Sequence, residues 1–424
     1  MTRQPDNRPS PDTHVSPELR EDDGTYPLHT EARYRSELAS NDRDGVAHNN
    51  LANLLRGSGR YDEAETHYRR ALDAMPESAE IHSNLAGALE ALNRFDDAEA
   101  AYHHALQLDP GFAPARFNLG LLLLGAGRYA EGWPYFEARS QVFLEHGELP
   151  FPQWRGEELT GRSLLLLPEQ GYGDTIQFVR YAAVLQARGV ARISIVSDPL
   201  LAPLLRTVAG IDEVLTDPRS LHAHDYWVSV MSVPAHVGTT IQSIPAAIPY
   251  VGVYRNRMDA WQSRLPSQGL RVGLVWKGNP EHANDAARSL PHFRELAPLW
   301  SVGNVSFVSL QTGAAEAETE ACETTQPLVR VGRYLQDFAD TAAVVAQLNL
   351  VICVDTAIAH LAGALGVACW VMLPRTGVDW RWHRAGSGTH WYPQSTYLFR
   401  QDDSGWPGVI GAVRDTLADV ARGR

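Results

Sequence analysis

The sequence predicts a chain of three parts: a polar N-terminal segment, an array of helical repeats, and two α/β domains with parallel sheets. A set of residues that recurs every 34 positions from Asn50 onward predicts the repeats. Beyond them, short apolar strands alternate with helices, which is the strand-helix-strand order of a doubly wound sheet. At 424 residues the chain is long enough for several domains, each with its own core.

Composition and charge restrict the classes of partner. A formal net charge of -13 argues against a nucleic-acid partner. The cysteines, Cys322, Cys353 and Cys369, lack C-x-x-C spacing, so neither a disulfide framework nor a zinc site is expected. The longest apolar run, 361–373, is too short to span a bilayer, and the N-terminus has no apolar secretion segment. We therefore expect a cytoplasmic protein without a bound metal.

Residues 1–24 are rich in Pro, Asp, Arg and Ser and contain few large apolar side chains. A segment of this kind cannot bury enough surface to offset the entropy of ordering it. The sequence therefore predicts a disordered tail.

Residues 25–149 are predicted to form the helical repeats. The pattern resembles tetratricopeptide repeats, in which pairs of antiparallel helices stack on one another. Extending the register backwards through Glu31, Tyr34 and Leu38 adds the second helix of a partial repeat, giving about three and a half repeats. The recurring residues are Asn50, Asn84 and Asn118; Leu51, Leu85 and Leu119; Arg60, Arg94 and Arg128; and Tyr61, Phe95 and Tyr129.

The three asparagines occupy the same point of each first helix and predict a ladder of amides along one face. Amides that donate and accept can bind an extended peptide backbone whatever its sequence. In the large tetratricopeptide-bearing protein O-glycosyltransferases, which these units resemble, an asparagine ladder has this role. The alternative is that Asn50, Asn84 and Asn118 stabilise turns or face water.

The first α/β domain is predicted over 150–266. A strand at 162–167 leads into a loop with the sequence G-Y-G-D at 171–174 and then a helix at 175–187. Glycines allow the backbone to turn tightly and approach a ligand closely. Asp174 at the helix start is either an N-cap or a general base for a hydroxyl.

The second α/β domain is predicted over 267–424. Its strand at 350–354 is followed by Asp355 and Thr356 and by a helix at 357–365, with His360 one turn in. Ligands of such sheets bind beyond the carboxyl ends of the strands, and free amides at a helix start favour an anion. We expect a phosphate-bearing ligand there, although Asp355 and Thr356 could simply cap the helix. A final helix at 409–421 is predicted to cross between the domains.

The segment D-T-A-I-A-H-L-A-G-A-L at 355–365 is similar to the D-T-G-x-x-H-L-x-A-A-L signature of heptosyltransferase-like glycosyltransferases of family 9. These enzymes adopt the GT-B fold of two facing Rossmann-like domains, and the G-x-G-D segment resembles their G-D element. With the repeats, the chain resembles the bacterial tetratricopeptide-repeat glycosyltransferases of that superfamily.

The resemblance implies a nucleoside-diphosphate sugar as donor substrate, no cofactor, and Asp174 as catalytic base. Ala357 replaces the usual glycine of the signature, and Lys277 and Arg288 could instead be solvated cations. The implied acceptor side of the cleft comprises Gly171, Tyr172, Gly173 and Trp382. The implied donor-binding residues are Lys277, Arg288, Gln311, Asp355, Thr356, Ala357 and His360.

The function predicted on this basis is metal-independent, inverting transfer of a sugar to a hydroxyl of a protein or peptide recruited by the repeats. One alternative is a saccharide or small-molecule acceptor, with the repeats serving oligomerisation or localisation. The other is a scaffold whose glycosyltransferase-like half has lost activity. A homo-oligomer is compatible with all three.

Overall fold

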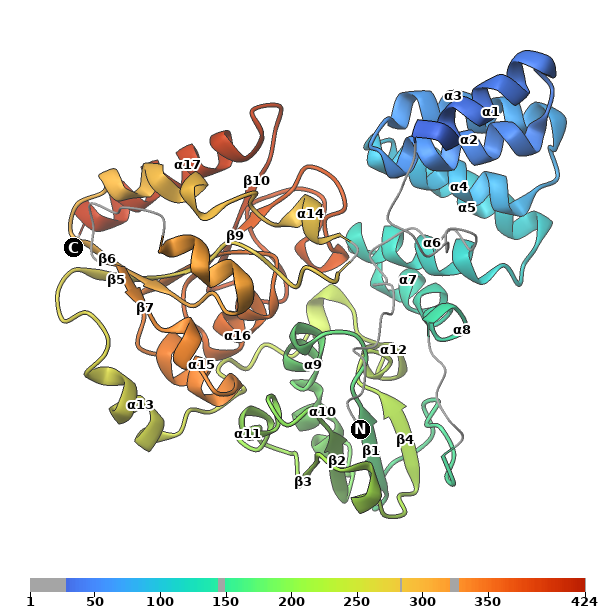
Figure 1. The fold of residues 1–424 in the computed structure, drawn as a ribbon. Helices are drawn as coiled ribbons and strands as arrows, with labels where there is room; N and C mark the ends of the chain where they lie inside the picture. Colours follow the sequence, from blue (N-terminus) through green and yellow to red (C-terminus); the bar gives the residue numbers. More distant parts are fainter. Residues whose placement is uncertain (1–27, 144–148, 283, 321–327, 424) are drawn as a thin grey trace. The chain divides into compact units, whose positions relative to one another are not determined.

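The computed structural model describes residues 28–143, 149–282, 284–320 and 328–423, so the predicted tail at 1–24 and Cys322 lie outside the described residues. The chain divides into two compact units, Met1–Glu145 and His146–Arg424. Figure 1 shows helices alone in the first unit and both helices and sheets in the second.

The first unit is an array of antiparallel helix pairs in which α2 packs on α3, α4 on α5 and α6 on α7 (Figure 1). Helix α1 packs on α2 and supplies the second helix of the partial repeat. The helices are α1 (Leu28–Ser40), α2 (Gly45–Gly57), α3 (Tyr61–Ala74), α4 (Ala79–Ala91), α5 (Phe95–Leu108), α6 (Ala113–Gly125), α7 (Tyr129–Phe136) and α8 (Arg139–Phe143).

The core of this unit is built from the recurring small and aromatic positions. Ala64 and Ala98 are fully buried, as are Tyr68 and Tyr102 four residues later. Gly132 takes the alanine position in the third pair, where a Cβ would lie 2.9 Å from the side chain of Leu124. The 34-residue period therefore records which side chains face the neighbouring helix.

The recurring arginines have a role that the sequence analysis did not assign. Arg94 binds Glu65 of the preceding α3 at 2.7 Å and Asp97 of its own helix at 2.7 Å. Each such guanidinium ties one helix pair to the next at the exposed turn. The equivalent pairs are Arg60 with Glu31 and Glu63, and Arg128 with Glu99 and Glu131.

The second unit contains two sheets in which every pairing is parallel, and this confirms the predicted α/β fold class. The strand orders are β3-β2-β1-β4 and β10-β9-β8-β5-β6-β7. The strands are β1 (Ser163–Leu167), β2 (Arg192–Val196), β3 (Glu213–Leu215), β4 (Tyr226–Ser229), β5 (Leu270–Val275), β6 (Val305–Ser309), β7 (Leu328–Arg330), β8 (Leu350–Val354), β9 (Cys369–Leu373) and β10 (Thr396–Arg400).

Helices follow the strands in both α/β domains. The second domain also has a long 3-10 segment, η3 (Phe293–Ser301). The α-helices are α9 (Tyr172–Phe178), α10 (Tyr181–Ala187), α11 (Ala202–Leu205), α12 (Val233–His236), α13 (Arg255–Gln262), α14 (Asp285–Arg288), α15 (Phe338–Val345), α16 (Ala357–Leu365) and α17 (Gly405–Arg422).

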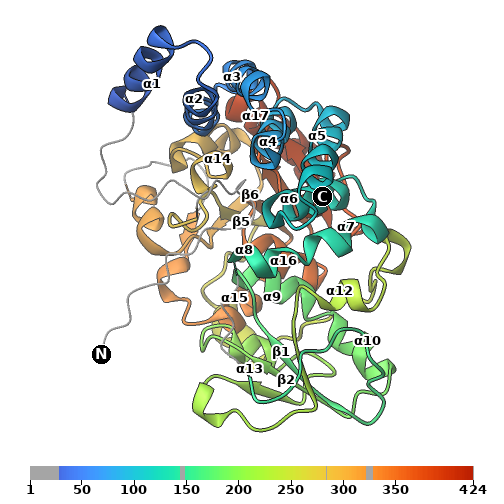
Figure 2. The ribbon, with the colours of Figure 1, turned by 90° about the vertical axis from the view of Figure 1, so that its right-hand side faces the viewer.

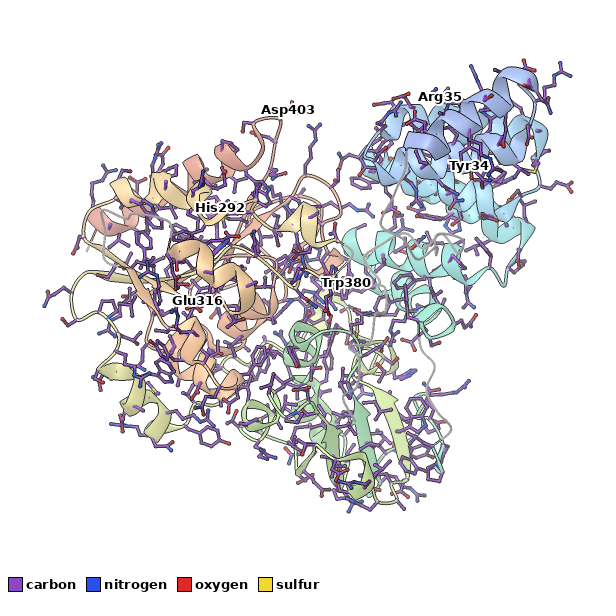
Figure 3. The ribbon with its side chains drawn as sticks, viewed as in Figure 1. Tyr34, Arg35, His292, Glu316, Trp380 and Asp403 are labelled. Atoms are coloured by element: carbon purple, nitrogen blue, oxygen red, sulfur yellow. The ribbon has the colours of Figure 1, made fainter. Side chains whose placement is uncertain are left out.

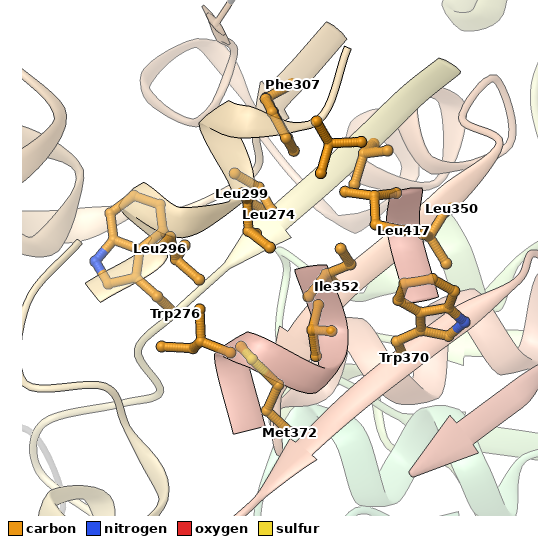
Figure 4. Close-up of a cluster of buried hydrophobic side chains, with 14 of the residues drawn as sticks. Leu274, Trp276, Leu296, Leu299, Phe307, Leu350, Ile352, Trp370, Met372 and Leu417 are labelled. Atoms are coloured by element: carbon orange, nitrogen blue, oxygen red, sulfur yellow. The ribbon is translucent and has the colours of Figure 1, made fainter. Parts of the chain in front are cut away.

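A core cluster of the second domain lies between its sheet and the pair η3 and α17 (Figure 4). Leu274, Ile352 and Met372 project from adjacent strands into this cluster, where Leu417 of α17 meets them. Helix α17 packs on η3 and β10 of its own domain. Its buried apolar residues belong to the core of the second sheet, and the predicted crossing between the domains stays a prediction.

Candidate functional site

In each sheet the strand order reverses at one point, and ligands of such sheets bind at the carboxyl ends of the strands there. In the second sheet the chain runs from β5 outward to β6 and β7 and then returns to β8 on the other side of β5. Loops leaving neighbouring strands in opposite directions open a crevice at their carboxyl ends. In the first sheet the equivalent point lies between β1 and β4, where Ser229 donates a hydrogen bond to Glu169.

The first helices beyond these two points pack against each other. Helix α9 follows β1, helix α16 follows β8, and the two lie side by side in both views of the fold (Figures 1 and 2). A Cβ on Gly173 would lie 2.8 Å from Cδ2 of His360 and 3.3 Å from Cα of Ala357. Glycine at 173 therefore permits the contact that brings the two predicted ligand-binding corners into one site.

Asp174 lies at the start of α9, and both of its carboxylate oxygens are engaged. The backbone NH of Gly171 donates to Oδ2 at 2.8 Å, and Nη2 of Arg381 donates to Oδ1 at 2.5 Å. Burial raises the pKa of this carboxyl, the charge of Arg381 opposes that rise, and Asp379 and Glu169 add to it. Each oxygen keeps a second lone pair, so the group can still accept a proton.

Arg381 is the centre of a buried ion-pair cluster that the sequence analysis missed. Its guanidinium also binds Asp379 at 2.5 Å, and its backbone NH donates to Asp379 at 2.8 Å. The ring of Trp380 lies 4.8 Å from the guanidinium carbon, and that of Phe178 lies 5.4 Å from it. Only 3% of Arg381 is exposed, so it is a fixed cation in the site.

The sequence carried a weak signal for this cluster. The run D-W-R-W at 379–382 contributed only Trp382 to the predicted site. Figure 3 shows Trp380 where the two α/β domains meet. An arginine between aromatic residues gives no indication of a carboxylate partner more than 200 positions earlier in the chain.

Asp355 lies at the carboxyl end of β8 and is half-buried. Burial raises its pKa to about 6, and the nearby carboxylate of Asp379 adds to the effect. Arg288, the indole of Trp382 and Arg381 lower the pKa and so oppose the rise. A carboxyl group with this pKa exchanges a proton near neutral pH.

The start of α16 has the features of an anion site. The hydroxyl of Thr356, its N-cap residue, is buried and has no hydrogen-bond partner among the described residues. The first amides of a helix carry a partial positive charge and are free of intrahelical partners. Thr356 and Ala357 therefore present a hydroxyl and backbone donors at the crevice.

Arg288 has the features expected of the predicted donor-binding cation. Its side chain is 14% exposed, and its nearest acidic contact is Asp285, with Nε 3.6 Å from the carboxylate. Within the described part of the chain, Nε of Arg288 has no hydrogen-bond partner. A Cβ on Gly278 would lie 2.9 Å from the guanidinium, so glycine leaves room for it beside the β5 loop.

Two residues of the predicted donor set have other roles in the structure. The ammonium of Lys277 binds Glu318 at 2.5 Å. Gln311 accepts hydrogen bonds from the backbone NH groups of Trp276 and Lys277 at 3.1 and 3.0 Å, and its amide nitrogen donates to the carbonyl of Lys277 at 3.2 Å. Gln311 thus fixes the end of β5 and Lys277 is paired with Glu318, and the place of both residues in the donor set stays a prediction.

His360 is buried in an aromatic cluster beside the anion site. Its ring stacks on Trp382 with centroids 5.2 Å apart, and Nδ1 lies 3.1 Å from the hydroxyl of Tyr392. Burial holds its pKa well below the usual range, and the charges of Arg381 and Arg180 act in the same direction. His360 is therefore neutral at physiological pH and serves as a hydrogen-bonding group.

Tyr172, the first residue of α9, packs against the second α/β domain. Its ring lies 5.0 Å from that of Phe338 at the start of α15. Burial raises its pKa to about 12, and a hydrogen bond with Asp198 contributes to the rise. The first residue of α9 thus contacts the second α/β domain.

The predicted asparagine ladder is largely covered. Asn84 and Asn118 are 6% and 4% exposed, and Asn50 is half-buried. The amide of Asn84 donates to Asn49 at 3.4 Å. These amides thus expose little surface in the structure, and peptide binding by this face stays a prediction.

Among the residues that the structure describes, no cluster of three or more His, Cys, Asp or Glu side chains is arranged to hold a metal ion. Across the same residues, every helix is too short or too polar to cross a membrane.

Comparison with known proteins confirms the repeats. The profile of the Tetratricopeptide repeat family matches residues 49–113 and 88–140. Protein FlbA of Caulobacter vibrioides (strain ATCC 19089 / CIP 103742 / CB 15) is 28% identical over 330 residues, which cover 71% of this chain and 54% of FlbA. This chain thus spans about half the length of that relative, 54%.

Two solved structures are similar to the second unit in chain trace. E. coli ADP-heptose lps heptosyltransferase II is 14% identical, with a TM-score of 0.46, over 62% of this chain and 99% of that chain. The glycosyl transferase family 9 structure from Veillonella parvula DSM 2008 is 13% identical, with a TM-score of 0.43, over 62% of this chain and 90% of that chain. At these identities and TM-scores, neither structure bears on what this chain binds.

Proposed function

We propose that this chain is a glycosyltransferase that moves a sugar from a nucleoside-diphosphate donor to a hydroxyl group. The observation that supports it most is the contact of α9 with α16, where Gly173 lies against His360 and Ala357. That contact brings a partly buried carboxylate, Asp174, beside a helix start suited to phosphate. A general base and an anion site are the two parts that such a transfer requires.

The proposed chemistry assigns one step to each part. Asp174 takes the proton of the acceptor hydroxyl while the oxygen forms a bond to the anomeric carbon. The bond from that carbon to the donor phosphate breaks, and its electron pair leaves with the diphosphate. Arg288, the Thr356 hydroxyl and the α16 amides stabilise the charge of the leaving group. Direct displacement inverts the anomeric centre.

Arg288 and the helix start supply the positive potential at the leaving group, so the proposal assigns no divalent metal to this step. Asp355 lies beside the same phosphates with a pKa of about 6. The negative charge of a bound phosphate raises this pKa further, so we assign Asp355 to the loaded donor site in its protonated form, in which it donates a hydrogen bond to phosphate. This choice avoids placing two negative charges next to each other.

For the acceptor, the repeats favour a protein or peptide, because arrays of this kind are interaction surfaces. The assay is transfer of a labelled sugar by the full chain to a peptide library, compared with free mono- and oligosaccharides. Label on peptides supports the proposal. Label on free sugars alone would assign the enzyme to a saccharide acceptor.

The donor site is tested by thermal stabilisation with a panel of nucleoside diphosphates and nucleotide sugars. A ligand that binds the native state raises the melting temperature by mass action. We expect a base-selective increase that Arg288→Ala abolishes and that Arg414→Ala, which removes an exposed arginine of α17, leaves intact. If no nucleotide raises the melting temperature of the wild type, the scaffold alternative is favoured.

A further inference from the structure

Both α/β domains contribute equally to the contacts around Arg381. Helix α9 provides a carboxylate and a ring, Asp174 and, four residues later, Phe178. The segment after β9 provides another carboxylate and another ring, Asp379 and Trp380. Each α/β domain thus contributes one acid and one aromatic face to a single guanidinium.

We infer that Arg381 and Asp379 are positioning residues for the carboxylate of Asp174. The inference rests on the proposed function, in which Asp174 is the general base. The two terminal nitrogens of the guanidinium bind different acids: Nη2 donates to Asp174 and Nη1 donates to Asp379, both at 2.5 Å. Arg381 therefore fixes the direction of the Asp174 oxygens relative to the α16 start.

Asp379 has a separate effect in this cluster. An arginine paired with Asp174 alone would lower the proton affinity of the Asp174 carboxylate and make that carboxylate a weaker base. Because Asp379 shares the cation, the three groups carry a net charge of one negative unit. Asp379 is itself held by the backbone NH of Arg381 at 2.8 Å, so the sharing is fixed by the local turn.

The other titratable groups near Asp174 come from two elements. Glu169 lies in the loop that precedes α9 and is bound by Ser229. His360 lies on α16 against Gly173 and is neutral. The cation that dominates at Asp174 is Arg381, and the shift of the Asp174 pKa follows burial, Arg381 and Asp379 in that order.

The arrangement predicts opposite effects for two changes that each remove one charge. Asp379→Asn leaves Arg381 to Asp174 alone, so the titration midpoint of Asp174 falls by about one pH unit. Arg381→Gln removes the cation, so the midpoint rises by about as much. Arg381→Lys keeps the positive charge but cannot bind both acids at once, so we expect a smaller rise in the midpoint. This variant replaces Arg381→Gln if that protein does not fold.

The measurement is the carboxyl carbon signal of Asp174 in the full chain labelled at aspartate Cγ, identified by its loss in Asp174→Asn. Asp402→Asn, at an exposed loop, serves as the matched control and leaves the midpoint unchanged. If Asp379→Asn raises the midpoint or leaves it in place, Asp379 merely holds the local fold and the inference is wrong. An equal midpoint in wild type and Arg381→Lys also contradicts it.

This readout needs no substrate, so it separates the two proposals. Opposite midpoint changes without any nucleotide binding support the cluster and contradict the proposed function. Nucleotide binding with unchanged midpoints supports the proposed function and contradicts the role of Arg381 and Asp379. Where transfer is measurable, the acid limb of the kcat/KM profile moves to lower pH in Asp379→Asn and to higher pH in Arg381→Lys.

Discussion

Gly173 of the first α/β domain lies directly against the ring of His360 of the second. A Cβ at position 173 would lie 2.8 Å from Cδ2 of His360. The ring cannot yield, because it is buried, stacks on Trp382 and meets the hydroxyl of Tyr392. The two helices that carry the candidate base and the anion site are therefore held at a separation that only glycine permits.

We expect Gly173→Ala to weaken the contact between α9 and α16. Overpacking of a filled contact costs about 1–3 kcal/mol of unfolding free energy. Nucleotide-dependent stabilisation should fall with it, because the start of α16 shifts. Denaturant unfolding checks the first effect. Gly411→Ala, at a helical glycine of α17 with open space around it, is the control and should be neutral or stabilising.

Asp355 should make the protein less stable as pH rises. Its folded pKa of about 6 exceeds the ordinary value of 3.8, so the stability it contributes is complete below about pH 4 and is lost as pH rises through 6. In Asp355→Asn that loss should disappear, leaving the variant more stable than wild type at pH 7 by on the order of 1–3 kcal/mol. Thermal unfolding from pH 4 to 8 tests this, and a variant that follows the wild-type curve would contradict it.

The structure also separates what the sequence reveals from what it does not. The 34-residue period identified the repeats because burial against a neighbouring helix imposes the same residue types at each turn. Asp174 and Asp355 were predicted because each follows a strand and begins a helix, a position that chain order alone defines. Arg381 was missed because its key partner lies in another domain, and no local pattern connects the two.

Several predicted site residues have partners or burial that the sequence does not reveal. Lys277 and Gln311 do lie beyond strand ends, as predicted, but their polar groups are used by Glu318 and by backbone amides. Asn84 and Asn118 recur with the right period, yet both are covered. Sequence position gives the end of a strand or the face of a helix, whereas the partners of a polar side chain depend on packing between distant segments.

Lys277→Ala should therefore reduce stability and leave nucleotide binding unchanged. The loss leaves Glu318, which is 18% exposed, without its cation while Trp276 and Phe293 still donate to it. A partly buried carboxylate that loses a charged partner costs about 1–3 kcal/mol. The pKa of Glu318 is lowered in the fold, so the deficit should shrink as pH falls through that pKa. Loss of nucleotide-dependent stabilisation in Lys277→Ala would return this lysine to the donor site.

The last prediction concerns the turns of the repeats. Arg94 joins α3 to α5 through Glu65 and Asp97; the side chains of Arg94 and Asp97 are exposed, and that of Glu65 is partly buried. We expect Arg94→Ala to lower the melting temperature at low ionic strength and the difference to narrow in 1 M salt, where charges are screened over about 3 Å. Arg414→Ala, which removes a pair between the adjacent residues Arg414 and Asp415, should change little at either salt concentration. A deficit of Arg94→Ala that persists at high salt would mean that the arginine acts through the packing of its stem, because screening leaves apolar contacts in place.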